Sequence, residues 1–145
     1  APVMAFCRIS DAPIRLREPV TKPDAVIIVD ATLLHHVDLF AGLSAEGYVL
    51  INSTRSLAAL GIAELTDRHQ PARVATIDAT GIARTQLGRP LPNVCLLGAF
   101  AALAGAVTPA SIETAVRDRF VGAVAAANVR AARDAFARLE RVTHA

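Results

Sequence analysis

Residues 23–55, PDAVIIVDATLLHHVDLFAGLSAEGYVLINSTR, decide the fold of this 145-residue chain. Two continuous apolar runs, AVIIV at 25–29 and YVLI at 48–51, suit strands that are buried on both faces, as in a parallel sheet. A helix is predicted between them, because apolar residues recur there at helical spacing: Leu33, Leu34, Val37, Phe40 and Ala41. This βαβ unit places polar residues after each strand, where open α/β sheets bind ligands.

Strands and helices alternate along the rest of the chain, which predicts a single-domain α/β fold with a mostly parallel sheet flanked by helices. The sequence predicts further strands at 3–9 and 74–77, and an exposed connection or short edge piece over 14–21. Helices are expected at 56–60, 79–87, 94–104, 108–120 and from 122 toward 142, with a surface helix or loop at 62–72.

The segment 94–104 (VCLLGAFAALA) is apolar all round, so we expect a helix that is buried on most sides. Gly98 and the alanines beside it would let another backbone come close. Asn93 is expected to cap this helix, and Thr108 followed by proline is a start signal for the next one.

The composition is 53% hydrophobic and 19% charged, which fits a sheet covered by helices or a subunit that hides surface in an assembly. No apolar run reaches the roughly 18 residues that span a membrane. The net charge is +2 and aromatic residues make up 4%, so a base-stacking nucleic-acid surface is not expected. We therefore expect contact with neither membranes nor nucleic acid.

Cys7 and Cys95 lie in apolar runs and form no CxxC pair, so both are predicted to be buried free thiols of a cytoplasmic protein. Two cysteines cannot hold an iron–sulfur cluster, which needs four ligands. His35 and His36 are adjacent, and neighbouring helical side chains point about 100° apart, so a shared metal ion is not expected.

Polar residues end the predicted strands at Asp30, Asn52 and Asp78. They would present polar groups to a ligand or partner, or they would cap helices and form turns. The run from Asn52 to Arg55 combines an amide, two hydroxyls and a cation, which suits phosphate or carboxylate binding. No complete catalytic motif accompanies it.

Six short motifs in order along the chain resemble the gamma subunit, or gamma domain, of the 2-oxoacid:acceptor oxidoreductases, the pyruvate:ferredoxin oxidoreductase superfamily. They are RISDAPI (8–14), KPD (22–24), INS (51–53), DATGIA (78–83), LG (87–88) and NVCLLGA (93–99). The resemblance implies a Rossmann-like domain and covers almost the whole chain.

Gamma subunits of this family usually begin with a strand, a glycine-rich loop and a helix, which this sequence lacks. The chain starts with Ala1-Pro2-Val3, where the family has a polar segment leading into "GAPV". We therefore expect a native polypeptide that extends further upstream.

The resemblance implies a non-catalytic, cytoplasmic subunit of a complex that oxidatively decarboxylates a 2-oxoacid with coenzyme A to an acyl-CoA and CO2. Thiamine diphosphate, Mg and [4Fe-4S] clusters are implied on alpha-, beta- and delta-type subunits, and electrons pass to ferredoxin or another acceptor. The gamma part helps to enclose coenzyme A. Five residues are then candidates to face that cofactor: Thr32, Asn52, Ser53, Thr54 and Arg55.

Two other functions stay open. The chain could be the small subunit of an indolepyruvate or aryl-2-oxoacid oxidoreductase, which shares the fold, or a free-standing nucleotide-binding module. The module would be a stable monomer that binds a nucleotide alone. The apolar helix at 94–104 and the high overall apolarity favour an obligate partner surface instead.

Overall fold

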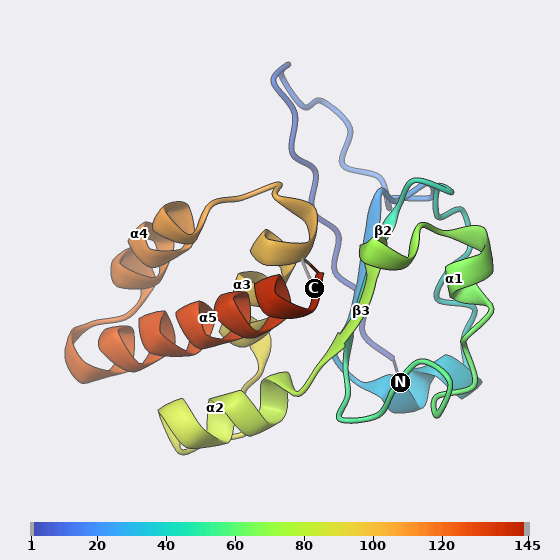
Figure 1. The fold of residues 1–145 in the computed structure, drawn as a ribbon. Helices are drawn as coiled ribbons and strands as arrows, with labels where there is room; N and C mark the ends of the chain where they lie inside the picture. The colour runs from blue at the N-terminus through green and yellow to red at the C-terminus, as the bar shows by residue number, and fades with distance from the viewer. Residues whose placement is uncertain (1, 144–145) are drawn as a thin grey trace.

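The computed structural model describes residues 2–143, and within them three parallel strands form one sheet in the order β1–β2–β3. The strands are β1 (Ala25–Ile28), β2 (Tyr48–Asn52) and β3 (Val74–Ile77). The longer helices of the C-terminal half lie on one face of this sheet, and loops with short helices at residues 31–35 and 65–68 lie on the other (Figure 1). The predicted α/β fold with a parallel sheet is confirmed.

The remaining elements follow in chain order. They are η1 (Ala31–His35), α1 (Leu65–Arg68), η2 (Pro71–Arg73), α2 (Ala79–Leu87), α3 (Asn93–Ala104), α4 (Pro109–Arg119) and α5 (Gly122–Thr143). The predicted strand at 74–77 and the helix at 79–87 are confirmed at both ends. The C-terminal helices are confirmed to within a residue or two.

β2 lies at the centre of the core, and Val49, Leu50 and Ile51 are each 0% exposed. Leu50 faces the helices and packs in one cluster with Cys95. Val49 and Ile51 face the opposite way and pack in a second cluster with Leu60. A strand with apolar side chains on both faces therefore needs both layers.

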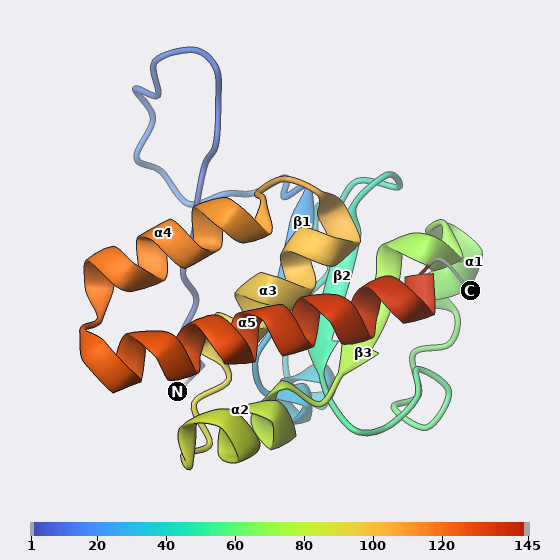
Figure 2. The ribbon, with the colours of Figure 1, turned by 60° about the vertical axis from the view of Figure 1, so that its left-hand side comes forward.

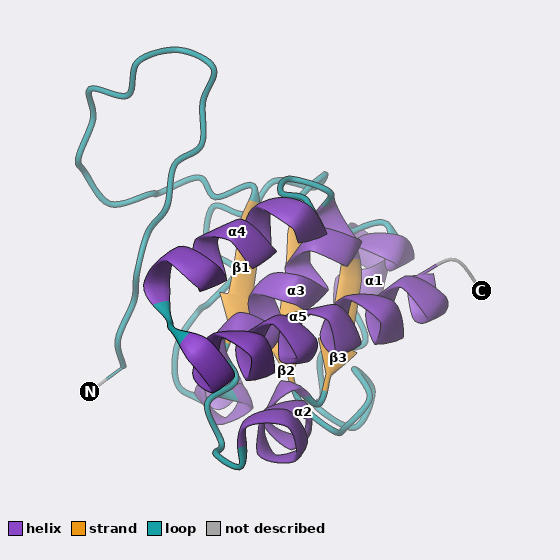
Figure 3. Cartoon of the chain, turned by 90° about the vertical axis from the view of Figure 1, so that its left-hand side faces the viewer, coloured by secondary structure: helices purple, strands orange, loops and turns teal. Residues whose placement is uncertain are grey.

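The helical layer is built around the contact between α3 and α5, which cross in front of the sheet in Figures 2 and 3. At their crossing, a Cβ atom on Gly98 would lie 2.8 Å from the Cα atom of Ala132 and would overlap the Ala132 carbonyl. The predicted close backbone approach at Gly98 is confirmed.

The prediction that Asn93 caps α3 is wrong. Pro92 occupies the cap position, no side chain caps the helix, and Asn93 is its first residue. Proline fixes φ near the helical value, so the turn that precedes the helix starts it without a side-chain cap.

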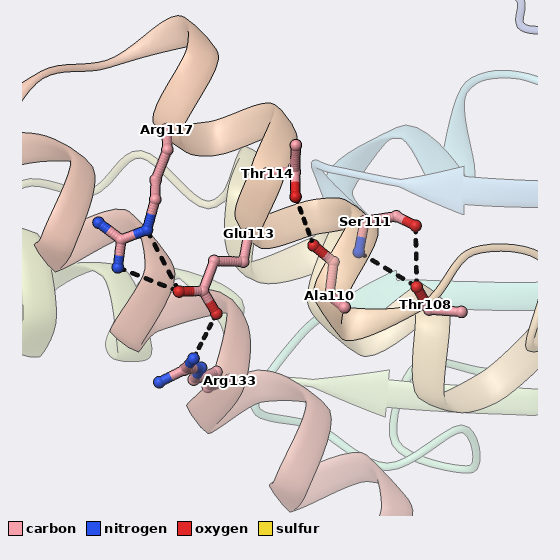
Figure 4. Close-up of polar contacts among 7 residues, drawn as sticks. All are labelled: Thr108, Ala110, Ser111, Glu113, Thr114, Arg117 and Arg133. Atoms are coloured by element: carbon pink, nitrogen blue, oxygen red, sulfur yellow. Dashed lines mark hydrogen bonds and ion pairs between the residues drawn. The ribbon is translucent and has the colours of Figure 1, made fainter.

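Thr108 caps α4 as expected, and Figure 4 shows how that helix is held. The Thr108 hydroxyl accepts a hydrogen bond from the Ser111 N–H at 3.1 Å. Glu113 forms an ion pair with Arg117 at 3.0 Å and a second one with Arg133 of α5. The hydrogen bond from Arg117, with a further contribution from Arg133, lowers the pKa of Glu113.

The helix predicted over residues 33–41 is wrong. Only the short 3-10 helix η1 forms, and turns follow it. Of the residues with helical spacing, Leu34 and Phe40 pack in a core cluster from successive turns, together with Leu39 and Leu43, whereas Val37 is 36% exposed. Gly42 then turns the chain with φ +74°, against the backbone of Thr21.

The helix predicted at 56–60 is also wrong. That segment forms consecutive turns in which Leu60 and Gly61 donate to the carbonyls of Ser56 and Ala58. The expected helix or loop at 62–72 is present as α1 and η2. Leu60 and Leu65 bury their side chains against the sheet from these turns.

Residues 2–20, here called the N-terminal arm, run beside the sheet and project from the body as a long loop (Figures 1 and 3). The strand predicted at 3–9 is wrong, because the arm pairs with no strand edge within residues 2–143. The Arg8 guanidinium donates to the Glu18 carbonyl at 3.0 Å and closes the base of the loop. The exposed connection at 14–21 is confirmed, and Ala1 lies outside the described residues.

Large apolar side chains of the arm are between 50% and 89% exposed: Val3, Met4, Phe6, Ile9, Ile14 and Leu16. On the helical face of β1, Ile27 and Val29 are 39% and 49% exposed, because the helices do not extend over this strand. By contrast, α3 is largely covered by α5, β2 and α2. Most of the α3 side chains are therefore covered within the chain, although Leu97 is 37% exposed, and the arm carries the largest group of exposed apolar side chains.

The prediction that both cysteines are buried holds for Cys95 and is wrong for Cys7, which lies exposed on the arm. Burial raises the pKa of Cys95 to about 11. The apolar neighbours of Cys7 suggested a core strand, but no layer of the described chain covers them.

Replacing Gly98 by Ala should destabilise the chain by about 1–3 kcal/mol, because the added methyl group overlaps the Ala132 backbone. Elsewhere in a helix, the same change stabilises by roughly 0.5–1 kcal/mol. Urea unfolding measures the difference, and Ala137→Gly on the exposed face of α5 is the control for helix propensity alone. A more stable Gly98→Ala variant would contradict the close crossing of α3 and α5.

The two thiols should react at very different rates with iodoacetamide at pH 8. A pKa of about 11 leaves roughly one Cys95 thiol in a thousand ionised, and its side chain is also buried. Intact-mass analysis of the folded chain should show one adduct, on Cys7, and two adducts after denaturation. Equal labelling of both cysteines in the folded chain would rule out the buried position of Cys95.

Candidate functional site

The carboxyl ends of β1, β2 and β3 lie along one edge of the sheet, because the strands are parallel and in register. Val29 and then Asp30 follow the end of β1, Asn52 is the last residue of β2, and Asp78 directly follows β3. These polar residues therefore surround one small region, from which η1 and α2 leave. This edge is the candidate functional site.

Asn52 is the centre of the hydrogen bonding at the edge. Its Nδ2 atom donates to the Val29 carbonyl at 3.0 Å and to the Thr80 hydroxyl at 2.8 Å. Its Oδ1 atom accepts from the backbone N–H groups of Ala79 at 3.0 Å and Thr80 at 3.3 Å. The side chain has two amide hydrogens and two acceptor lone pairs, so these contacts occupy its full capacity.

Asp30 and Asp78 act as helix caps. Asp30 Oδ1 accepts from the Thr32 N–H at 2.9 Å and from the Thr32 hydroxyl at 2.7 Å. The hydroxyl contact is the main cause that lowers the pKa of Asp30. Asp78 Oδ1 accepts from the Gly81 N–H at 2.8 Å. Of the two roles predicted for Asp30 and Asp78, ligand binding or helix capping, the structure shows helix capping.

The N-terminus of α2 is already occupied by side chains of this chain. A helix start normally offers free N–H groups that can bind an anion. Here Asn52 takes those of Ala79 and Thr80, and Asp78 takes that of Gly81. A phosphate group would therefore have to displace an internal hydrogen bond to bind at this helix.

The loop that follows β2 carries the remaining polar groups. Ser53 donates its N–H to the Ile77 carbonyl at 3.0 Å, and its hydroxyl accepts from the Arg55 N–H at 3.0 Å. The Arg55 guanidinium donates through one nitrogen to the Ala59 carbonyl, and its side chain stays exposed. Thr54 is also exposed.

The structure brings the predicted site residues to one edge but gives them different roles. Thr32 and Ser53 use their hydroxyls in local contacts, and Asn52 ties neighbouring elements together. Thr54 and Arg55 are both exposed, and the Arg55 guanidinium uses one nitrogen on the Ala59 carbonyl. Thr80, which sequence reasoning missed, is the direct partner of Asn52. Its position just after a strand-ending aspartate was the available signal.

His35 and His36 are exposed at the end of η1. Within residues 2–143, no group of three or more histidine, cysteine, aspartate or glutamate side chains could hold a metal ion. No described helix is long and apolar enough to cross a membrane. The exposed polar side chains of the loop after β2 at this edge are therefore those of Thr54 and Arg55.

An α/β fold whose strand ends carry the motifs INS and DATGIA matches one known family. The family described as pyruvate ferredoxin/flavodoxin oxidoreductase matches residues 1–138. The chain belongs to this family.

Several relatives are close to this chain in sequence. The pyruvate/ketoisovalerate oxidoreductases common subunit gamma of Pyrococcus abyssi is 40% identical over 97% of this chain and 74% of its own length. The pyruvate synthase subunit PorC of Methanothermobacter marburgensis is 41% identical over 97% of this chain and 73% of its own length. These relatives confirm the resemblance to gamma subunits.

A solved structure has the same fold. The crystal structure of the pyruvate oxidoreductase subunit PORC of Thermotoga maritima superposes with a TM-score of 0.69 at 30% identity. The match covers 81% of this chain and 64% of that subunit, so the chain spans less than two thirds of the subunit's length.

Proposed function

We propose that this chain is the gamma-type accessory subunit of a multi-subunit 2-oxoacid oxidoreductase in the cytoplasm. In that assembly, alpha-, beta- and delta-type subunits would hold thiamine diphosphate, Mg and [4Fe-4S] clusters, and ferredoxin or a similar carrier would accept the electrons. The complex would convert a 2-oxoacid and coenzyme A into an acyl-CoA and CO2. The chain itself would contribute no catalytic residue.

The observation that carries this proposal is the uncovered apolar surface of the N-terminal arm and β1. Monomeric proteins rarely leave contiguous large apolar side chains in water, and such surface is typical of an interaction site. Here Phe6, Ile9 and Leu16 are at least half exposed, and Ile27 and Val29 of the sheet are 39% and 49% exposed. Packing against other subunits of an assembly would account for this exposure.

The relatives support a pyruvate-type complex over an indolepyruvate enzyme, because their names refer to pyruvate and ketoisovalerate. The Pyrococcus subunit is named as common to two oxidoreductases. One gamma chain that serves two substrates cannot determine which 2-oxoacid is accepted. We therefore assign the choice of 2-oxoacid to other subunits of the proposed complex.

Iron–sulfur clusters are assigned to the partners because this chain has two cysteines, and a [4Fe-4S] cluster takes four. Cys95 is buried and Cys7 lies on the arm, so even these two are in different environments. The redox chemistry of the complex therefore takes place on other polypeptides.

The role proposed for the strand-end edge is to form part of the coenzyme A site. The exposed Thr54 hydroxyl and Arg55 guanidinium can reach an anionic group, which Arg binds well through its planar fork. The start of α2 is closed to phosphate by Asn52 and Asp78. Coenzyme A would thus meet the loop after β2 rather than the helix terminus.

The proposed function is tested by affinity purification of the tagged chain from its native host. Large partner subunits, thiamine diphosphate and iron–sulfur absorbance should co-purify, and the complex should reduce a viologen dye with pyruvate and coenzyme A. Omitting this chain from a reconstituted complex should abolish the coenzyme A-dependent rate. A chain that purifies alone as a stable, nucleotide-binding monomer would overturn the proposal.

Replacing Arg55 by Ala should raise the KM for coenzyme A about three- to tenfold and leave kcat nearly unchanged, because a charge-assisted contact outside the reacting groups is lost. Steady-state kinetics of the reconstituted complex measure the change. Arg130→Ala, on an exposed position of α5, is the matched control and should leave the KM unchanged. An unchanged KM in Arg55→Ala would remove Arg55 from the site.

A further inference from the structure

Asn52 has no polar atom left for a ligand, yet it lies directly before the loop that carries Arg55. It holds the residue that follows β1 through the Val29 carbonyl, and it holds the first turn of α2 through the N–H groups of Ala79 and Thr80. An amide that is fully used by the protein acts through the elements it joins.

The loop is anchored at both ends. At its far end, Leu57 and Leu60 pack in the core cluster with Val49 and Ile51. At its near end, Ser53 is held to β3 by the hydrogen bond from its N–H to the Ile77 carbonyl. The contacts of Arg55 stay within the loop, to the Ser53 hydroxyl and the Ala59 carbonyl, so the near end that Asn52 and Ser53 hold is the part that carries Arg55.

Asn52 also keeps the start of α2 closed. Its Oδ1 atom occupies the Ala79 and Thr80 amides, while the Thr80 hydroxyl accepts from its Nδ2 atom. One side chain thus sets both the position of the loop and the spacing between that loop and the helix.

We infer that Asn52 is a positioning residue: it orients the loop formed by Ser53, Thr54 and Arg55 toward coenzyme A and does not contact the cofactor itself. This inference rests on the proposed function, since it concerns the same edge. It separates the five residues singled out from the sequence into an anchor, Asn52, and ligand-facing groups, Thr54 and Arg55.

Asn52→Asp is the most informative variant because it keeps the size of the side chain and its acceptor atoms. A carboxylate cannot donate to the Val29 carbonyl, so the loop loses its tie to β1, whereas the Thr80 hydroxyl can reverse its role and donate to the carboxylate. Thr80→Val is a milder variant that removes the hydrogen bond between Asn52 and the hydroxyl. Thr80→Ser keeps that hydroxyl and serves as the rescue control.

The experiment is a double-mutant cycle of Asn52→Asp and Arg55→Ala in the reconstituted complex, with KM for coenzyme A and kcat measured separately. Asn52→Asp should raise the KM at least about twofold with little change in kcat, and the double variant should raise the KM by less than the product of the two single effects. Thr80→Val should raise the KM in the same direction, and Thr80→Ser should restore it. If Asn52→Asp does not assemble, Thr80→Val takes its place in the cycle.

Independent, multiplying effects in the double variant would overturn the inference, since they would mean that Asn52 acts without Arg55. The inference would also be overturned if Asn52→Asp left the KM for coenzyme A unchanged while Arg55→Ala raised it. A failure of the proposed function gives a different result, because Arg55→Ala itself would then leave the KM unchanged.

Amide hydrogen exchange of the loop tests the positioning role of Asn52 independently of the kinetics. Residues 53–60 should exchange faster in Thr80→Val than in Thr80→Ser. Equal exchange in these two variants would overturn the positioning role, whatever the kinetics show.

Discussion

The structure depends on one constraint, which is that β2 carries apolar side chains on both faces and must be covered on both. Val49, Leu50 and Ile51 are completely buried only because α3 and α5 pack on one side and the turns around Leu60 pack on the other. The same constraint is not met at β1, where the helices end short of Ile27 and Val29. The molecule is thus a complete core with one uncovered flank, and the N-terminal arm lies on that flank (Figure 3).

The elements that sequence reasoning predicted well are those whose pattern and boundaries agree. Residues 74–77 (VATI) are rich in β-branched side chains and are followed by Asp78, and the helices before Gly88 and Gly105 end where glycine adopts a left-handed conformation. The helix predicted over residues 33–41 does not form, because apolar residues in a series of turns can also pack into a core. Periodicity alone does not distinguish such turns from a helix. The strand predicted over residues 3–9 does not form, because a segment with high strand propensity becomes a strand only where it pairs with the edge of a sheet.

The location of the candidate site could be predicted, but its internal contacts could not. Parallel strands bring Asp30, Asn52 and Asp78 to one edge, which follows from the fold class alone. Whether each side chain faces a ligand depends on partners far away in sequence, as the hydrogen bond from Asn52 to Thr80 shows. The edge also explains why a gamma-type chain need not hold a cofactor alone. Under the proposed function, the exposed residues Thr54 and Arg55 would form only part of a binding site, which other subunits would complete.

The central claim is that this chain is built as a subunit whose arm and β1 are covered by partners. The most direct measurement is amide hydrogen exchange of the chain alone and within the purified assembly. Strong new protection of residues 2–20 and of β1 in the assembly, with little change in α3 and α5, is the predicted result. Equal exchange of the arm in both states would contradict the account, because the apolar surface would then remain in water after assembly.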